Sequence, residues 1–199
     1  MLELLLKGGV LMYPILFCSV LALAIFLERV WFYARFVRGN RGLLDDLEPL
    51  LAGQRFDEAA IVCQRVGNPL ARVCIAALRL AGRPRIQIKA VVEETGGREV
   101  APLERYLGLL GTTATISPLL GLLGTVLGMI RAFNVLAVQG TGTPATLGGG
   151  ISEALITTAA GLSVAIPTLL LHKYLTSRVD RIALDLEEKA LRVVDLIGE

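Results

Sequence analysis

The sequence is poor in the residue types on which most enzymes and disulfide-bonded proteins depend. Its 199 residues include only three cysteines and one histidine. Three cysteines give no even set for a disulfide framework, and the spacing of Cys18, Cys63 and Cys74 matches no metal-binding or CxxC motif, so we interpret them as small buried apolar residues. With one histidine, no Ser/His/Asp or Cys/His constellation can be assembled. We therefore expect neither an enzyme nor a need for a metal or other cofactor.

An excess of charge of one sign is also lacking. The 20 Lys and Arg residues nearly balance the 18 Asp and Glu residues, and the arginines are spread through the chain rather than gathered in one basic tract. This distribution excludes nucleic acid as the main partner. A phosphate-binding loop is excluded as well, because the glycine-rich stretches contain no GK[ST] and follow no soluble strand.

Apolar residues, by contrast, are abundant. They make up 54% of the chain, and the mean hydropathy of +0.63 is too high for an ordinary soluble domain. Three apolar runs, Gly8–Leu27, Tyr106–Val138 and Ile151–Leu171, are each long enough to cross a bilayer as a helix. The second would reach roughly 50 Å at about 1.5 Å per residue, so part of it should project beyond the membrane. A lipid bilayer is therefore the expected surrounding.

The first run has an alternative interpretation as a cleaved signal peptide, with Ala22-Leu23-Ala24 as the cleavage site. Only Lys7 precedes the run, however, and the positive charges follow it. That order favours a retained anchor. The aromatic group from Trp31 to Tyr33 suits the membrane interface.

Loop charge predicts the orientation. The segment Phe36–Arg105 carries eleven Lys or Arg residues, the loop Asn134–Gly150 carries none, and five follow Leu171. By the positive-inside rule, the N-terminus and the Gly/Thr-rich loop are periplasmic, and the insertion and the C-terminal tail are cytoplasmic.

The insertion between the first two runs is predicted to form a small helical collar. Breakers separate amphipathic helices at Leu43–Leu51, Asp57–Arg65 and Leu70–Leu80, and Ile86–Leu107 can run as one helix into the membrane. The expected class is an all-α integral membrane protein whose long second and third helices extend into the cytoplasm. We divide the chain into a first membrane helix with its interface (1–35), a cytoplasmic helical insertion (36–104), a second membrane helix (105–138), a periplasmic loop (139–150), a third membrane helix (151–175) and a C-terminal cytoplasmic helix (176–199).

One acidic residue, Glu153, stands in the third apolar run. No other ionisable side chain occurs from Thr146 to Leu171. A carboxylate in such a run is costly unless it is neutral, paired or beside water. The functional interpretation is a carboxyl group that takes up and releases protons as water access changes. The structural alternative is a neutral carboxyl that joins helices through a hydrogen bond.

Small and hydroxyl residues gather in the last two runs. Gly121, Gly124, Gly128 and Gly161 recur at spacings that let helix backbones approach closely, which predicts a tight bundle or a homo-oligomer. Thr and Ser hydroxyls either bond their own i−4 carbonyls or line a wet path beside Glu153. Thr157 lies on nearly the same helix face as Glu153, whereas Thr158 is turned about 140° away and would need a neighbouring helix.

Two further polar residues have ordinary interpretations. Arg131, near the outer end of the second run, is expected to extend its long stem to the lipid headgroups, with a partner contact as the alternative. His172 most simply marks the cytoplasmic interface, with a proton relay as the alternative.

The last two runs together resemble the MotA/TolQ/ExbB proton-channel family, nearest to its ExbB and TolQ branch. The segments that carry the resemblance are PLLGLLGTVLGMIRAF (Pro118–Phe133) and ISEALITTAAGLSVAIPTLLL (Ile151–Leu171). The resemblance places Glu153, Thr125 and Thr158 on the family's polar positions beside its proton path. Thr157 and Arg131 stand where relatives often carry an apolar and a neutral residue, respectively.

The resemblance also implies partners and a function. It implies a homopentamer that encloses the membrane helices of a dimeric ExbD- or TolR-like protein. Proton passage through this inner-membrane complex would drive a TonB- or TolA-like protein for outer-membrane transport or envelope integrity. The alternative is a non-conducting scaffold subunit of an envelope complex; a membrane enzyme would need a cluster of catalytic groups that the sequence does not offer.

Overall fold

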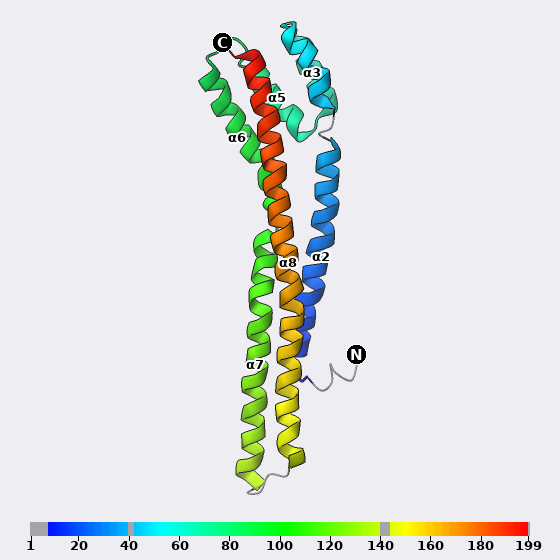
Figure 1. The fold of residues 1–199 in the computed structure, drawn as a ribbon, viewed down its shortest axis with the longest axis vertical. Coiled ribbons are helices and arrows are strands. Elements are labelled where there is room, and N and C mark those ends of the chain that lie inside the picture. Colours follow the sequence, from blue (N-terminus) through cyan, green and yellow to red (C-terminus); the bar gives the residue numbers. More distant parts are fainter. Residues whose placement is uncertain (1–7, 40–41, 140–143, 199) are drawn as a thin grey trace. The chain divides into compact units, whose positions relative to one another are not determined.

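The computed structural model describes residues 8–39, 42–139 and 144–198, and every regular element in these ranges is an α-helix (Figure 1). Stretches within Met12–Val37, Arg85–Ala137 and Gly148–Ile197 are long and apolar enough to cross a membrane. The predicted class, an all-helical protein with three candidate membrane spans, is confirmed. In chain order the helices are α2 (Met12–Gly39), α3 (Leu43–Ala52), α4 (Phe56–Val66), α5 (Pro69–Leu78), α6 (Arg85–Glu104), α7 (Leu107–Gln139) and α8 (Pro144–Ile197).

The described residues form two compact units. The span unit holds the chain up to Leu27 together with Tyr106–Tyr174, and the insertion unit holds Glu28–Arg105 together with α8 from Leu175 onward. The C-terminal part of α8 thus shares a unit with the insertion that precedes α7. The six segments proposed from the sequence follow one another along the chain and do not group the C-terminal helix with the insertion.

The outer faces of the span-unit helices are apolar. Leu170 on α8, for example, is 66% exposed. A continuous apolar surface of this kind is a liability in water, but lipid tails solvate it without penalty. The exposed large apolar residues of these helices include Tyr13, Phe17, Val20, Leu23, Leu119, Leu122, Val126, Ile130, Phe133, Leu155, Ile166 and Leu170.

Small residues line the seam between α7 and α8. A Cβ added at Gly124 would lie 2.4 Å from Cγ2 of Thr157, and one at Gly161 would lie 2.6 Å from the carbonyl oxygen of Ser117. Gly121 and Gly128 meet the backbone of α8 at similarly short range. These approaches leave no room for a side chain, which supports the packing role predicted for the four glycines.

The insertion unit is built in the opposite way, around a core of large aliphatic residues. Leu47 of α3, Leu70 of α5, Ile88 of α6 and Val194 of α8 are all fully buried in one cluster. Charged pairs tie the same helices together at the surface: Arg72 with Glu99, Arg85 with Asp195, and Arg192 with Glu48. This part of the molecule therefore has the packing of a small water-soluble domain.

The helix boundaries of the insertion follow from local capping. Gly67 closes α4 in the left-handed conformation, with φ of 63°. The side chain of Asn68 then accepts a hydrogen bond from the Ala71 amide, and Pro69 occupies the first position of α5. A glycine C-cap followed by an asparagine N-cap and a proline is the usual way to separate two short helices.

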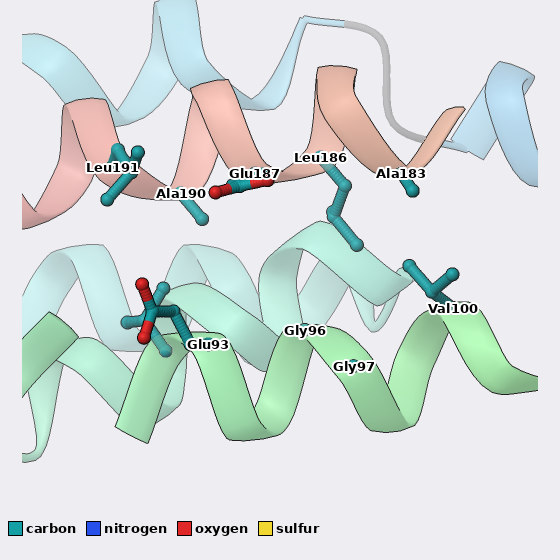
Figure 2. A pocket seen from close by; sticks show the side chains of 10 residues that line it. Glu93, Gly96, Gly97, Val100, Ala183, Leu186, Glu187, Ala190 and Leu191 are labelled. Carbon is teal, nitrogen blue, oxygen red and sulfur yellow. The ribbon is translucent and has the colours of Figure 1, made fainter. Parts of the chain in front are cut away.

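A groove of about 300 Å³ runs between α6 and α8 within the insertion unit (Figure 2). Gly96 and Gly97 form its floor on α6, and a Cβ added at either one would meet no atom within 4 Å. Leu186 and Ala190 of α8 face them across the groove. Glu93 and Glu187 place one carboxylate on each side.

The prediction that Ile86–Leu107 forms one helix is wrong, because α6 ends at Glu104 and α7 begins at Leu107. Tyr106 between them adopts a positive φ of 67°. Two side chains of α2 satisfy carbonyls that α6 leaves free at its end: Arg29 donates to the Pro102 carbonyl oxygen at 2.9 Å, and the Tyr33 hydroxyl donates to that of Leu103 at 2.8 Å. Donors distant in sequence thus compensate the break.

The ends of the membrane helices also differ from the predicted segments. Helix α8 begins at Pro144, so residues 144–150 of the predicted loop 139–150 are helical, and residues 140–143 lie outside the described residues. The third span and the C-terminal helix, separate in the proposed segments, are one uninterrupted helix to Ile197, in agreement with the long third helix predicted for the fold. The first helix begins at Met12 rather than Gly8, after a turn in which Gly9 has a φ of 69°.

Candidate functional site

Glu153 lies on α8 at the edge of a small cavity in the span unit. The cavity has a volume of about 20 Å³, enough for one water molecule. It lies between α7, α8 and the turn that precedes α2. Its walls are formed by Gly8, Val10, Leu11, Gly124, Leu127, Arg131, Glu153 and Thr157.

An arginine from the neighbouring helix pairs with this carboxylate. Nη1 of Arg131 on α7 donates to Oε1 of Glu153 at 2.5 Å. The Arg131 side chain is 53% exposed and the Glu153 side chain 24%. A guanidinium and a carboxyl group at this distance form an ion pair with a charge-assisted hydrogen bond. Of the states that the sequence left open for Glu153, namely neutral, paired or beside water, the structure shows the paired one.

The turn before α2 closes the cavity from a third side. Oε1 of Glu153 lies so close to Gly9 that a Cβ there would be 1.9 Å from it. The Gly8 carbonyl oxygen accepts a hydrogen bond from the Thr157 hydroxyl at 3.0 Å. Only a glycine at position 9 leaves this space for the carboxylate, and its positive φ also favours glycine. The carboxylate is therefore held between a cation and a bare stretch of backbone.

The four residues proposed for the proton path do not all meet at this cavity. Thr157 lines it, and its hydroxyl also lies 2.7 Å from the Glu153 carbonyl oxygen. Thr158 instead donates across the seam to the Gly121 carbonyl oxygen at 2.9 Å. Thr125 donates to the Leu122 carbonyl oxygen of its own helix at 2.6 Å and opens on a shallow surface cavity of α7. The structure thus brings Glu153 and Thr157 together and leaves Thr125 and Thr158 apart from them.

Most other hydroxyls of the spans follow the simpler interpretation. They donate to carbonyl oxygens four residues earlier in their own helix, as expected for Ser and Thr in an apolar surrounding. This pattern satisfies the hydroxyls without water. The examples on α7 and α8 are Thr112, Thr113, Thr115, Ser117 and Thr168.

Sequence reasoning gave a partner contact of Arg131 only as the alternative, and it missed the contact of Gly9. Arg131 was expected to extend to the headgroups, yet its guanidinium turns to Glu153. One signal was available: Arg131 is the sole charged residue of the second apolar run and Glu153 the sole charged residue of the third. Opposite charges on the two arms of a helical hairpin, at similar distances from its turn, are expected to pair. No comparable signal identified Gly9.

His172 packs against α7 rather than standing apart at the surface. A Cβ added at Gly111 would lie 3.1 Å from its Nε2 atom. The side chain is half-buried within the span unit. Its contact with a glycine explains how an imidazole fits against a neighbouring helix at this position.

Two of the three cysteines are buried as the sequence predicted, whereas Cys18 is only partly buried. Cys63 of α4 and Cys74 of α5 are both buried in the core of the insertion unit. The hydrogen bond with Cys63 and burial both raise the pKa of the Cys74 thiol, which keeps it protonated. Within the described ranges, no group of three or more His, Cys, Asp or Glu residues is placed to hold a metal ion.

Comparison with known proteins identifies the family. A model of the MotA/TolQ/ExbB proton channel family matches residues 65–188, which include α7 and Glu153. The chain is 37% identical over 165 residues to the biopolymer transport protein ExbB-like 3 of Synechocystis, covering 82% of this chain and 79% of that protein. It is 38% identical over 175 residues to ExbB-like 1 of the same organism, covering 86% and 69%.

A further relative, matched over a shorter stretch, belongs to the Tol-Pal system. The Tol-Pal system protein TolQ of Haemophilus influenzae is 42% identical over 88 residues, covering 44% of this chain and 39% of its own. The chain belongs to the MotA/TolQ/ExbB proton channel family, whose members are multi-pass membrane channel proteins rather than enzymes. The resemblance drawn from the two sequence segments is confirmed.

Proposed function

We propose that this protein is the proton-conducting subunit of an energy-transducing complex of the bacterial inner membrane. The proton motive force would drive a TonB- or TolA-like protein for outer-membrane transport or envelope integrity. One observation carries the proposal: Glu153, which is the sole charged residue of its apolar run and lies within the region that matches the family, borders a water-sized cavity. Acidic groups inside membrane helices usually mark ion or proton pathways.

Glu153 is the proposed proton acceptor. Its carboxylate lines a cavity large enough for one water molecule, and its Oε1 atom faces Gly9. Each elementary charge that crosses a potential of 100 mV is worth about 2.3 kcal/mol, which is enough to bias a single site. Thr157 borders the same cavity, and Thr125 and Thr158 would border the path where a neighbouring helix covers their faces.

The proposed assembly is a homopentamer around a dimeric, single-span ExbD- or TolR-like partner. The apolar outer faces of α7 and α8 support it, because such faces need either lipid or further helices as cover. The relatives' names, biopolymer transport and Tol-Pal system, support the choice of partners. Native mass spectrometry of the complex purified with the candidate partner would count the subunits.

The proposed orientation has a periplasmic N-terminus and a cytoplasmic C-terminus. It rests on the positive-inside rule, since the insertion is rich in Arg and the segment Asn134–Gly150 carries no Lys or Arg. Cysteines placed singly at exposed sites and labelled with a membrane-impermeant maleimide would test it in intact cells.

The central experiment replaces Glu153 with Gln, which keeps the shape and removes the ionisation. Proton flux into vesicles that hold the complex and its partner should fall to the level of empty vesicles. Glu187→Gln is the matched control, because it makes the same change at an exposed acid of the same helix. Full flux in Glu153→Gln would contradict the proposal.

A scaffold without conduction is the second candidate. The ion pair between Arg131 and Glu153 favours it, since a paired carboxylate can serve helix association alone. For a scaffold, Glu153→Gln leaves envelope function intact, whereas enlargement of Gly124 or Gly161 destroys assembly. Proton flux and assembly, both measured in each of these variants, distinguish a proton-conducting subunit from a scaffold.

A further inference from the structure

We propose that Arg131 is the counter-ion that Glu153 must release in order to take up a proton. The pair then acts as a proton-dependent latch between α7, α8 and the turn at Gly9. This inference rests on the proposed function, because it assigns a positioning role beside the proposed proton acceptor. It goes beyond that function because it concerns Arg131 and Gly9.

One oxygen atom of Glu153 makes both of the contacts that matter here. A single oxygen, Oε1 of Glu153, both accepts the Arg131 hydrogen bond at 2.5 Å and lies against Gly9. Among the described residues, Arg131 is the only charged side chain that lines the cavity with Glu153. Protonation of this one carboxylate therefore affects two contacts at once: its ion pair with α7 and its close approach to the turn, which Thr157 also holds through the Gly8 carbonyl oxygen.

Protonation of Glu153 changes the charge of its pair with Arg131. When a proton from water adds to a carboxylate oxygen of Glu153, the guanidinium keeps all its protons, because arginine does not lose them in proteins. The charge of the pair rises from zero to +1, and the charge-assisted hydrogen bond becomes one between a cation and a neutral acid. An uncompensated cation is costly in a low-dielectric site, so the guanidinium should leave.

The guanidinium of Arg131 has space to move away from Glu153. The Arg131 side chain is about half exposed and reaches the cavity from its rim, so its head can turn outward without unpacking α7. The buried contacts of α7 with α8 are made by Gly124 and its neighbouring glycines, and they do not involve Arg131. Proton uptake thus loosens the latch while the helix seam stays closed.

The test follows Glu153 directly, through the infrared band of its protonated carboxyl group in the purified protein. The band is assigned by its absence in Glu153→Gln. In Arg131→Gln the carboxylate has lost its counter-ion, so the band should persist to a pH about one unit higher than in the unaltered protein, equivalent to a tenfold change in proton affinity. Arg131→Lys keeps the charge and should restore most of the original midpoint.

A second variant guards against misfolding of Arg131→Gln. Gly9→Ala places a methyl group where Oε1 lies and should push the carboxylate off the guanidinium, which moves the band in the same direction. Gly149→Ala, at a glycine of α8 with open space around it, is the matched control and should leave the band unchanged.

The outcomes separate the two proposals. If the bands of Arg131→Gln and Gly9→Ala both titrate as in the unaltered protein, the latch is wrong even if Glu153→Gln abolishes proton flux. If Glu153→Gln conducts fully, the proposed function fails, whatever the infrared titration shows. A shift in Arg131→Gln that Arg131→Lys reverses, together with lost flux in Glu153→Gln, supports both.

Discussion

The span unit and the insertion unit are both helical, yet large apolar residues face outward in the first and inward in the second. In the span unit, large residues such as Leu170 face outward, and glycines such as Gly124 form the contacts between helices. In the insertion unit, large residues such as Leu47 lie inside, and charged pairs such as Arg72 with Glu99 lie at the surface.

The solvent explains this inversion. In water, burying a leucine is favourable, so helices associate through their largest apolar side chains. In lipid, a leucine gains nothing by burial, so helices associate where close backbone approach improves packing. Charges follow the same rule: ion pairs are spread over the insertion unit, whereas the span unit keeps one, Arg131 with Glu153, among the described residues of α7 and α8.

The strongest test of this contrast is Leu47→Ala in the insertion unit. Leu47 has no exposed surface, so its truncation removes buried methyl groups and leaves a cavity. We expect a loss of about 2–5 kcal/mol in the free energy of unfolding of this unit. Denaturant titration followed by circular dichroism measures it. Leu184→Ala, at a leucine of α8 that is 63% exposed, should change little; equal losses in the two variants would contradict the assigned core.

The corresponding test of the span unit adds volume instead of removing it. Gly124→Val inserts atoms at a point where a Cβ alone would lie 2.4 Å from Thr157, so α7 and α8 must separate. We expect a loss of about 1–3 kcal/mol, seen as a lower melting temperature in detergent. Gly108→Val, on the same helix with no atom near its Cβ position, should melt like the unaltered protein. An unchanged melting temperature in Gly124→Val would argue against the seam.

The smallest expected effect is that of a surface ion pair. The hydrogen bonds to Glu99 raise the pKa of the Arg72 guanidinium, which is charged near neutral pH in any case. Glu99→Gln should lower the stability of the insertion unit by only about 0.2–1 kcal/mol, and added salt should shrink the difference. Stability measured at low and high ionic strength checks this. A larger loss that salt does not reduce would mean that the pair is buried in the assembly.

Local patterns predicted most of the helices. The amphipathic stretch Leu43–Leu51 appears as Leu43–Ala52, and the second apolar run, Tyr106–Val138, appears as Leu107–Gln139. Both helices depend on features within a few residues of each position, namely the period of the apolar residues and helix breakers such as Gly53. Glu153 could be singled out in the same way, because a lone acid in an apolar run is visible without any structure.

Contacts between distant segments could not be predicted in this way. The end of α6 at Glu104 depends on Arg29 and Tyr33, which lie more than 70 positions earlier in the chain and donate to its last carbonyls. The contact of Gly9 with Glu153 joins the turn before α2 to α8. Such contacts are decided by how helices pack, and no spacing along the sequence encodes them.

The core of the insertion unit has a consequence for how the chain is made. Leu47 and Leu70 share one buried core with Leu186 and Val194, which the ribosome adds more than 100 residues later. At about 5–20 residues per second, the ribosome completes the C-terminal part of α8 on the order of ten seconds after the first part of this core. During that interval its leucines are uncovered, so the nascent chain should bind chaperones until α8 has been made.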